Sequence, residues 1–164
     1  MRCWLLALVS CVSSDPHVMV VTPDAHVPST ACLIENVLPR LVGTAPVMDC
    51  GSLGIGGEDA AFAAARDCVI AAESSRQPYM VLWQIQGIDS RVAKAHVGLN
   101  DNTTWTSYQL NYDGDPGGGG GDNRPVTTIW KCGAVSSQGA CPDLHNTLCL
   151  ECDSPVFFDR CPPR

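Results

Sequence analysis

Three cysteines and one histidine lie close together near the C-terminus: Cys141, His145, Cys149 and Cys152. Thiolates and an imidazole are ligands that zinc accepts, and Cys149 and Cys152 have the two-residue spacing of a common zinc half-site. The spacing of Cys141 and His145 fits no familiar zinc module, and cysteines in an oxidising compartment form disulfides instead. Disulfides are therefore the preferred interpretation and zinc is the alternative. No metal and no other cofactor is expected.

A second group of potential ligands lies in the acidic, glycine-rich segment 111–123. The carboxylates of Asp113, Asp115 and Asp122 are spaced oxygen ligands of the kind that calcium binds. An EF-hand loop needs glycine where Pro116 stands and a glutamate at its end, and the segment lacks both. We therefore expect a flexible acidic loop between two strands, with calcium binding as the alternative.

No stretch of the sequence assembles a nucleophile, a base and an orienting group, so no catalytic residue is assigned. Segment 50–54 has cysteine at the first glycine position of the Gly-x-Ser-x-Gly nucleophile elbow. His96 lies with Lys94 on the polar face of a predicted strand, where we expect it to be solvated. A protein that is not an enzyme is favoured. The alternative is an enzyme with an unrecognised site, for which His96 with Asp89 or Asp113 is the best candidate.

The charge balance argues against a nucleic-acid partner. The chain of 164 residues has 10 basic and 17 acidic side chains, which gives a net charge of -7. Nucleic-acid-binding proteins need clustered lysines and arginines to displace counterions from phosphates. Here the only lysines are Lys94 and Lys131, and the arginines are scattered. The length fits one domain with an apolar core of its own.

The ten cysteines point to an oxidising compartment. Cys3 and Cys11 belong to the N-terminal segment, and the other eight are candidates for up to four disulfides: Cys32, Cys50, Cys68, Cys132, Cys141, Cys149, Cys152 and Cys161. A bridge between Cys50 and Cys68 would pin a predicted helix to the loop before it. The five C-terminal cysteines are expected to pair mostly among themselves, with one of them reaching back to Cys32.

One long helix is predicted around Cys68. Glu58 and Asp59 place negative charge at its N-terminus, and Pro78 stops it. Between them, small and apolar residues recur at helical spacing: Phe62, Ala65, Val69 and Ala72. Because this stripe is mostly alanine, the helix should pack closely on its partner. A shorter helix over 33–42 is also considered, but Pro39 would interrupt it.

Four segments with alternating polarity follow the helix: 79–86, 91–99, 104–112 and 126–132. Turn residues separate them, so an antiparallel meander is predicted. The fold class is therefore α+β, with one helix packed on a four-stranded antiparallel sheet and a disulfide-rich C-terminal extension. This order of elements resembles the cystatin-like and NTF2-like architectures, in which a sheet wraps over a helix.

The N-terminus is similar to an export signal. Arg2 supplies a positive charge, and segment 4–9 is an apolar run too short to span a bilayer. The residues Leu8-Val9-Ser10-Cys11 resemble the lipobox of bacterial lipoproteins. This resemblance implies that Cys11 becomes the lipidated first residue of the mature chain, carrying acyl groups such as palmitate. Ordinary cleavage near Ser13 and secretion is the alternative.

The expected organisation is a signal and lipobox over 1–11, a tether over 12–31, an α+β domain over 32–132 and a cysteine-rich extension over 133–164. The composition is also similar to that of cysteine-rich lipoproteins of GC-rich bacteria. These resemblances imply a protein of the periplasm or outer membrane, held at the membrane through Cys11 or secreted. Its role would be binding or structural, with an envelope protein or a glycan as partner. The exposed sheet face or the acidic loop would be the contact surface.

Overall fold

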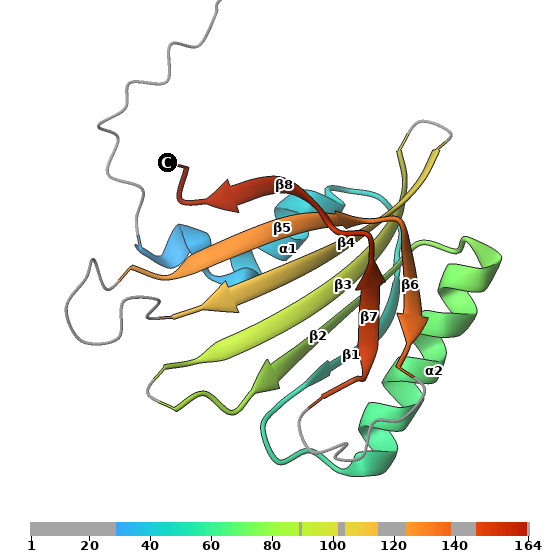
Figure 1. Ribbon diagram of the computed structural model, residues 1–164, viewed down its shortest axis with the longest axis horizontal. Coiled ribbons are helices and arrows are strands. Elements are labelled where there is room, and N and C mark those ends of the chain that lie inside the picture. The colour runs from blue at the N-terminus through green and yellow to red at the C-terminus, as the bar shows by residue number, and fades with distance from the viewer. Residues whose placement is uncertain (1–28, 89, 102–103, 115–123, 139–146, 164) are drawn as a thin grey trace, which may run out of the picture.

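The structure, a computed structural model, describes residues 29–88, 90–101, 104–114, 124–138 and 147–163. Within these residues the chain forms one short 3-10 helix, two α-helices and eight strands (Figure 1). In chain order they are η1 (Ser29–Cys32), α1 (Ile34–Val42), β1 (Met48–Leu53), α2 (Asp59–Ser75), β2 (Tyr79–Ile85), β3 (Val92–Asp101), β4 (Thr104–Asp113), β5 (Val126–Cys132), β6 (Ala134–Ser137), β7 (Leu150–Asp153) and β8 (Val156–Cys161). The α+β class expected from the sequence is confirmed.

Six strands form one mixed sheet in the order β1-β2-β3-β4-β5-β8. The four predicted strands are β2 to β5, and each is antiparallel to the next. β1 adds to one edge in parallel with β2, because α2 forms a crossover that returns the chain in the same direction. β8 adds to the other edge, antiparallel to β5. The predicted meander is therefore the middle of a larger sheet, and part of the segment expected as an extension is its last strand.

The boundaries of α2 follow the sequence prediction. Glu58 is its N-cap residue, and Arg76 ends it in the left-handed conformation with a φ of 52°. All residues of the predicted stripe are buried: Phe62, Ala65, Val69 and Ala72. They share a core with the Tyr79, Val81 and Trp83 side of β2. α2 thus packs on the face of the sheet to which these side chains of β2 point.

The opposite face of the sheet is covered by α1. The register of β2 and β3 explains why there are two apolar faces: Val81 lies opposite His96, and Leu82 lies opposite Ala95. Residues directly opposite in antiparallel strands share a face, so the alanines of β3 point away from α2. They pack instead with Ile34 and its neighbours in α1. The expectation of one helix on one sheet face is corrected, because each face has its own helix.

Pro39 lies inside α1 and does not interrupt it, contrary to the prediction. A proline removes one backbone donor from the helix interior. Two side-chain contacts flank the proline: Arg40 donates to the carbonyl oxygen of Asn36 at 2.9 Å, and Glu35 pairs with Arg91 of the sheet. Burial of the apolar side of the helix supplies the rest of its stability.

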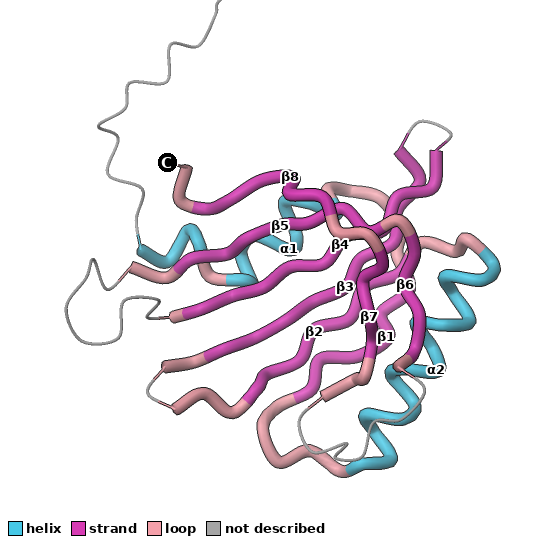
Figure 2. The backbone as a smooth tube through the Cα atoms, in the orientation of Figure 1, coloured by secondary structure: helices cyan, strands magenta, loops and turns pink. Residues whose placement is uncertain are grey.

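The remaining strands, β6 and β7, pair with each other and cross over one face of the sheet beside α2 (Figure 2). Their buried residues Val135 and Leu148, the second just before β7, belong to the same core as α2 and β2. A disulfide between Cys132 and Cys152 attaches this strand pair to the end of β5. The β6–β7 pair was not predicted, and it forms a wall over part of one face of the sheet.

Two further disulfides close the fold. Cys50 of β1 is bonded to Cys68 of α2, as the sequence suggested. Cys32 of η1 is bonded to Cys161 of β8, so a C-terminal cysteine does reach back to Cys32. Cys149 is disulfide-bonded as well. These bonds indicate an oxidising, extracellular type of environment.

Candidate binding site

An open groove lies between the β6–β7 pair and the exposed part of the sheet. It has a volume of about 340 Å³, which falls within the range of about 300–1,000 Å³ typical of small-molecule sites. Its lining comes from β4, β5, the β6–β7 pair and the turn into β8: Gln109, Asn111, Trp130, Gln138, Leu150, Glu151, Cys152 and Pro155. The Cys132–Cys152 disulfide anchors the wall of this groove to its floor, with the two Cα atoms 5.1 Å apart.

The floor residues Gln109, Asn111 and Trp130 occupy adjacent register positions on one face of the sheet. Gln109 of β4 lies between His96 of β3 and Trp130 of β5, and the next row contains Lys94, Asn111 and Thr128. All of these residues point to the same side of the sheet, because directly opposite residues share a face. The alternating polarity of segments 104–112 and 126–132 predicted a polar face for these strands. Of the residues on this face, the sequence singled out His96 and Lys94 of the neighbouring strand.

The two amide side chains on this floor, Gln109 and Asn111, form a hydrogen bond with each other. Gln109 Nε2 donates a hydrogen bond to Asn111 Oδ1 at 2.9 Å. Neither Gln109 Oε1 nor Asn111 Nδ2 has a hydrogen-bond partner in the part of the chain that the structure describes, and neither atom is buried. The floor therefore presents one acceptor and one donor side by side, each held by the amide-to-amide hydrogen bond.

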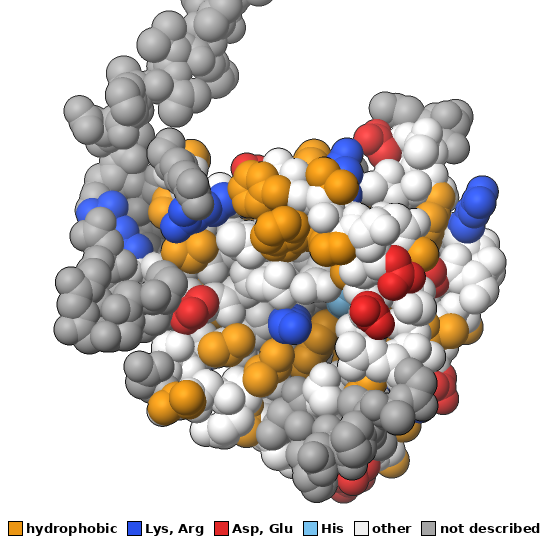
Figure 3. Space-filling view, in the orientation of Figure 1, with side chains coloured by type: hydrophobic (Ala, Val, Ile, Leu, Met, Phe, Trp, Pro, Cys, Tyr) orange, Lys and Arg blue, Asp and Glu red, His pale blue; other side chains and the backbone are white. Residues whose placement is uncertain are grey.

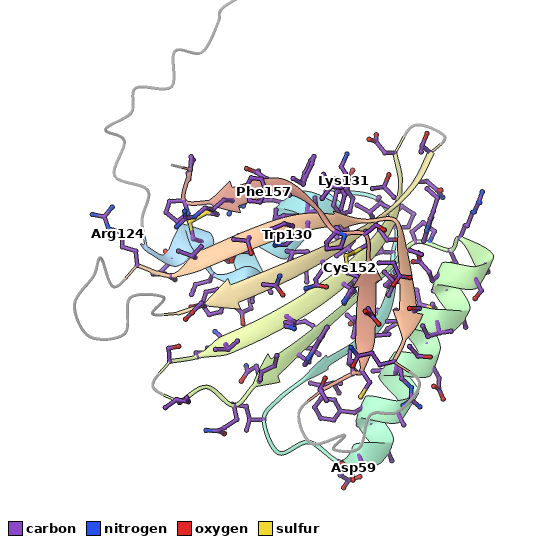
Figure 4. All side chains as sticks on the ribbon, in the orientation of Figure 1. Asp59, Arg124, Trp130, Lys131, Cys152 and Phe157 are labelled. Carbon is purple, nitrogen blue, oxygen red and sulfur yellow. A yellow bond between two sulfur atoms is a disulfide. The ribbon has the colours of Figure 1, made fainter. Side chains whose placement is uncertain are left out.

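An aromatic pair borders the floor. Trp130 of β5 is half-buried, and Phe157 of β8 is 54% exposed. Their ring centroids are 5.5 Å apart with the planes nearly perpendicular, at 82°. Figure 4 shows the two side chains next to each other on β5 and β8, with Cys152 on β7. Trp130 Nε1 donates to Thr128 Oγ1 at 3.3 Å, so the indole has a fixed orientation.

The charges around the groove are few. Glu151 stands on the β7 wall, and Lys94 lies opposite Asn111 at the side of the floor. Figure 3 shows this face of the molecule: apolar side chains gather over β8 and β5, acidic side chains over β6 and β7, and the surface between them is mostly uncharged. The chemistry of the groove is that of neutral amides beside an exposed aromatic edge.

His96 is buried, which corrects the expectation of a solvated histidine: its side chain is 1% exposed. It stacks on Trp83 with ring centroids 5.7 Å apart and the planes 4° from parallel. Burial, together with the nearby charge of Lys94, lowers the pKa of His96 to about 3. The imidazole is therefore neutral near pH 7. The sequence missed this burial because polarity alternation along one strand does not show what packs on its polar side, here the ring of Trp83.

The proposed partners of His96 in an enzyme are not brought to it. Asp113 shares its sheet face but lies opposite Val92, four residues along β3 from His96. At a rise of about 3.3 Å per residue, that separation is roughly 13 Å. The carboxylate of Asp113 instead accepts a hydrogen bond from Ser90 Oγ at 3.0 Å. Asp89 lies outside the described residues.

The structure also bears on the zinc and calcium sites that the sequence offered as alternatives. Cys152 and Cys149 are in disulfides and so cannot supply thiolates to zinc, which corrects that alternative. Their suggested co-ligands Cys141 and His145 lie outside the described residues, as do Asp115 and Asp122 of the calcium alternative and Cys11 of the lipobox. Within the described ranges, no group of three or more histidine, cysteine or acidic side chains could hold a metal ion.

A separate polar cluster ties the C-terminal end of α2 to the sheet. The carboxylate of Glu73 accepts hydrogen bonds from Tyr79 Oη at 3.0 Å, Trp105 Nε1 at 3.2 Å and Ser107 Oγ at 2.6 Å. Burial and the adjacent Glu73 raise the pKa of the Tyr79 phenol, so the phenol stays protonated and keeps donating. Since three donors converge on one carboxylate, this cluster has a structural role in positioning α2.

No family model, curated protein or solved structure matches the chain. The assignment of a site therefore depends on geometry: an open groove, uncharged hydrogen-bonding groups and an aromatic pair on a disulfide-braced sheet. The sequence named an exposed sheet face or the acidic loop as contact surface, and the groove itself could not be predicted, because its wall is built from β6 and β7.

Proposed function

We propose that this protein is an exported envelope protein, anchored through a lipid on Cys11, which binds a ligand in the groove beside the β6–β7 pair. The observation that carries the binding role is the groove floor, where Gln109 and Asn111 offer an acceptor and a donor that have no partner among the described residues. Polar groups that converge in a concave site and are held in place are typical of binding sites.

Three lines of support concern the location. The disulfides fit an oxidising compartment. In the described ranges, no helix has both the length and the apolar character needed to cross a bilayer, and the lipobox resemblance at Cys11 offers another means of attachment. The described chain starts at η1, which adjoins α1, whereas the groove lies on the opposite face of the sheet. The tether expected over 12–31 leads into this side of the fold and would therefore leave the groove accessible.

Mass measurement tests the location. The protein is isolated from the membrane fraction of the cells that make it, and its intact mass is determined with and without reduction. We expect a diacylglyceryl-sized increment on a chain that begins at Cys11, and a gain of two hydrogens for each bridge reduced. An unmodified chain that starts at Met1, carries free thiols and is found in the cytosol would overturn the proposal.

Cosedimentation tests the binding role. Insoluble envelope material is freed of lipid, so that the lipid anchor cannot hold the protein, and the purified full-length protein is spun down with it in mild detergent. We expect wild type and the surface control Gln77→Ala to sediment with the material, and Gln109→Ala to stay largely in solution. Equal sedimentation of all three, or of none, would contradict a role for the groove.

A further inference from the structure

We infer that the ligand of this groove is a glycan, whose hydroxyls are bound by Gln109 and Asn111 and whose ring face packs on Trp130. This inference rests on the proposed binding role of the groove and specifies the class of the ligand. It follows from the amides, the aromatic pair and the charge of the groove, each of which restricts the ligand in a different way.

The amides select hydroxyl groups. A hydroxyl both donates and accepts hydrogen bonds, and so do two neighbouring hydroxyls on a sugar ring. Gln109 Oε1 can accept from one of them while Asn111 Nδ2 donates to the next. Because the 2.9 Å hydrogen bond between the two amides already orients both groups, binding costs little side-chain entropy.

The aromatic pair selects a ligand that also has an apolar face. The C–H groups on one side of a pyranose ring form such a face, and its hydroxyls lie around the rim. Trp130 lies directly opposite Gln109 in the strand register, so a ring placed against the indole has its rim at the amides. Phe157 contacts the indole from the side at 5.5 Å and holds it against the groove.

The charges disfavour other classes of ligand. Among the residues that line the groove Glu151 alone is charged, so the groove carries a single negative charge, and the whole chain carries -7. A polyanion would meet repulsion from the protein as a whole.

An extended peptide binds most readily at an unpaired sheet edge through its backbone. The groove floor is instead the face of β4 and β5, whose backbone groups are already paired with neighbouring strands.

The first test uses an array that carries defined neutral, N-acetylated and acidic oligosaccharides, with peptides of matched length on the same slide. The purified full-length protein is applied in detergent, and the dissociation constants of its ligands are then measured by calorimetry. We expect binding to oligosaccharides. The variant Trp130→Ala should weaken it by about tenfold or more, which corresponds to the loss of one aromatic contact.

Two controls separate binding from folding. Gln109→Ala removes only a side chain from the floor and should weaken binding to a similar degree, whereas Gln77→Ala, in the exposed turn between α2 and β2, should leave the dissociation constant unchanged. Trp130→Phe keeps an aromatic ring and should retain most of the affinity. Unchanged affinity in both Trp130→Ala and Gln109→Ala would overturn the assignment of the glycan to this groove.

The second test distinguishes failure of this inference from failure of the proposed function. The envelope material used for cosedimentation is digested either with glycosidases or with a protease. Loss of cosedimentation after glycosidase treatment alone supports a glycan. Loss after protease treatment alone, with no glycan bound on the array, would refute the glycan while the binding role stands. Absence of cosedimentation with untreated material would refute both.

Discussion

The Cys32–Cys161 disulfide should be the largest single covalent contribution to the stability of the fold. It joins residues 129 positions apart, whereas the Cys50–Cys68 bridge joins residues 18 positions apart. In the chain-entropy description, a crosslink stabilises by restricting the unfolded chain, and the effect grows with the logarithm of the loop length. Removal of the long bridge by Cys32→Ala and Cys161→Ala should therefore cost about 4–5 kcal/mol, and removal of the short one about 3 kcal/mol.

The two pairs form a matched comparison. In each pair one cysteine is buried, Cys32 or Cys50, and the other is half-buried, so alanine leaves similar cavities. The two shorter loops lie inside the long one and shorten it, but the logarithm makes that correction small. A loss of 4–5 kcal/mol is a large part of the roughly 5–15 kcal/mol that stabilises a typical domain.

Guanidinium chloride unfolding, followed by tryptophan fluorescence and extrapolated linearly to water, measures both double variants. The long-bridge variant should also melt about 10–20 °C below wild type. A loss from the long-bridge variant equal to or smaller than that from the short-bridge variant would refute the reasoning. Strain or residual structure in the unfolded chain would then determine the stabilisation in place of loop length.

Three further predictions concern single side chains. Glu73→Ala leaves the buried hydroxyl of Tyr79 without its acceptor and should lower the free energy of unfolding by about 1–3 kcal/mol, measured by denaturant titration. His96 is protonated in the unfolded chain below pH 6.5 but in the folded protein only below about pH 3. Its contribution to the free energy of unfolding is therefore complete above pH 6.5 and is lost as the pH falls from 6.5 to 3. Wild type should therefore lose up to about 1.4 kcal/mol per pH unit more than His96→Gln across that window, and parallel pH profiles of the two proteins would contradict the buried state of His96. Gly98→Ala would place a methyl group 2.5 Å from a ring carbon of Tyr79 and 2.6 Å from one of Trp105, so a loss of about 1–3 kcal/mol is expected, and wild-type stability in thermal melts would show that this packing is wrong.

The groove brings together segments that are distant in the chain. Its floor comes from β4 and β5, its wall from β6 and β7, and its aromatic edge from β8. Crosslinks hold the segments at two points, Cys132–Cys152 beside the groove and Cys32–Cys161 at the end of β8. A rigid floor with oriented amides is suited to a ligand that is recognised mainly by hydrogen bonds, because fewer rotamers must be immobilised on binding.

Local patterns in the sequence were enough for the elements whose periodicity is strong. The stripe from Phe62 to Ala72 repeats at the helical period, and residues 79–132 alternate with the period of a strand, so α2 and the strands β2 to β5 were predicted close to their observed bounds. The bridge between Cys50 and Cys68 was also inferred, because Cys50 precedes the predicted helix and Cys68 lies within it.

Only the tertiary structure decided which residues are buried on each face and where the groove lies. β1 and β8 have only six residues each, and neither shows the regular alternation that identifies a strand from sequence. β8 begins with three exposed apolar side chains in a row. Lys94 and His96 do share one side of β3, as predicted, but the burial of His96 on that side depends on tertiary contacts such as the stacking of its ring on Trp83 of β2. The period of a strand is a local property, whereas register, sheet order and the layer that covers a face arise from contacts between distant segments, and these contacts made His96 a core residue and Gln109 a site residue.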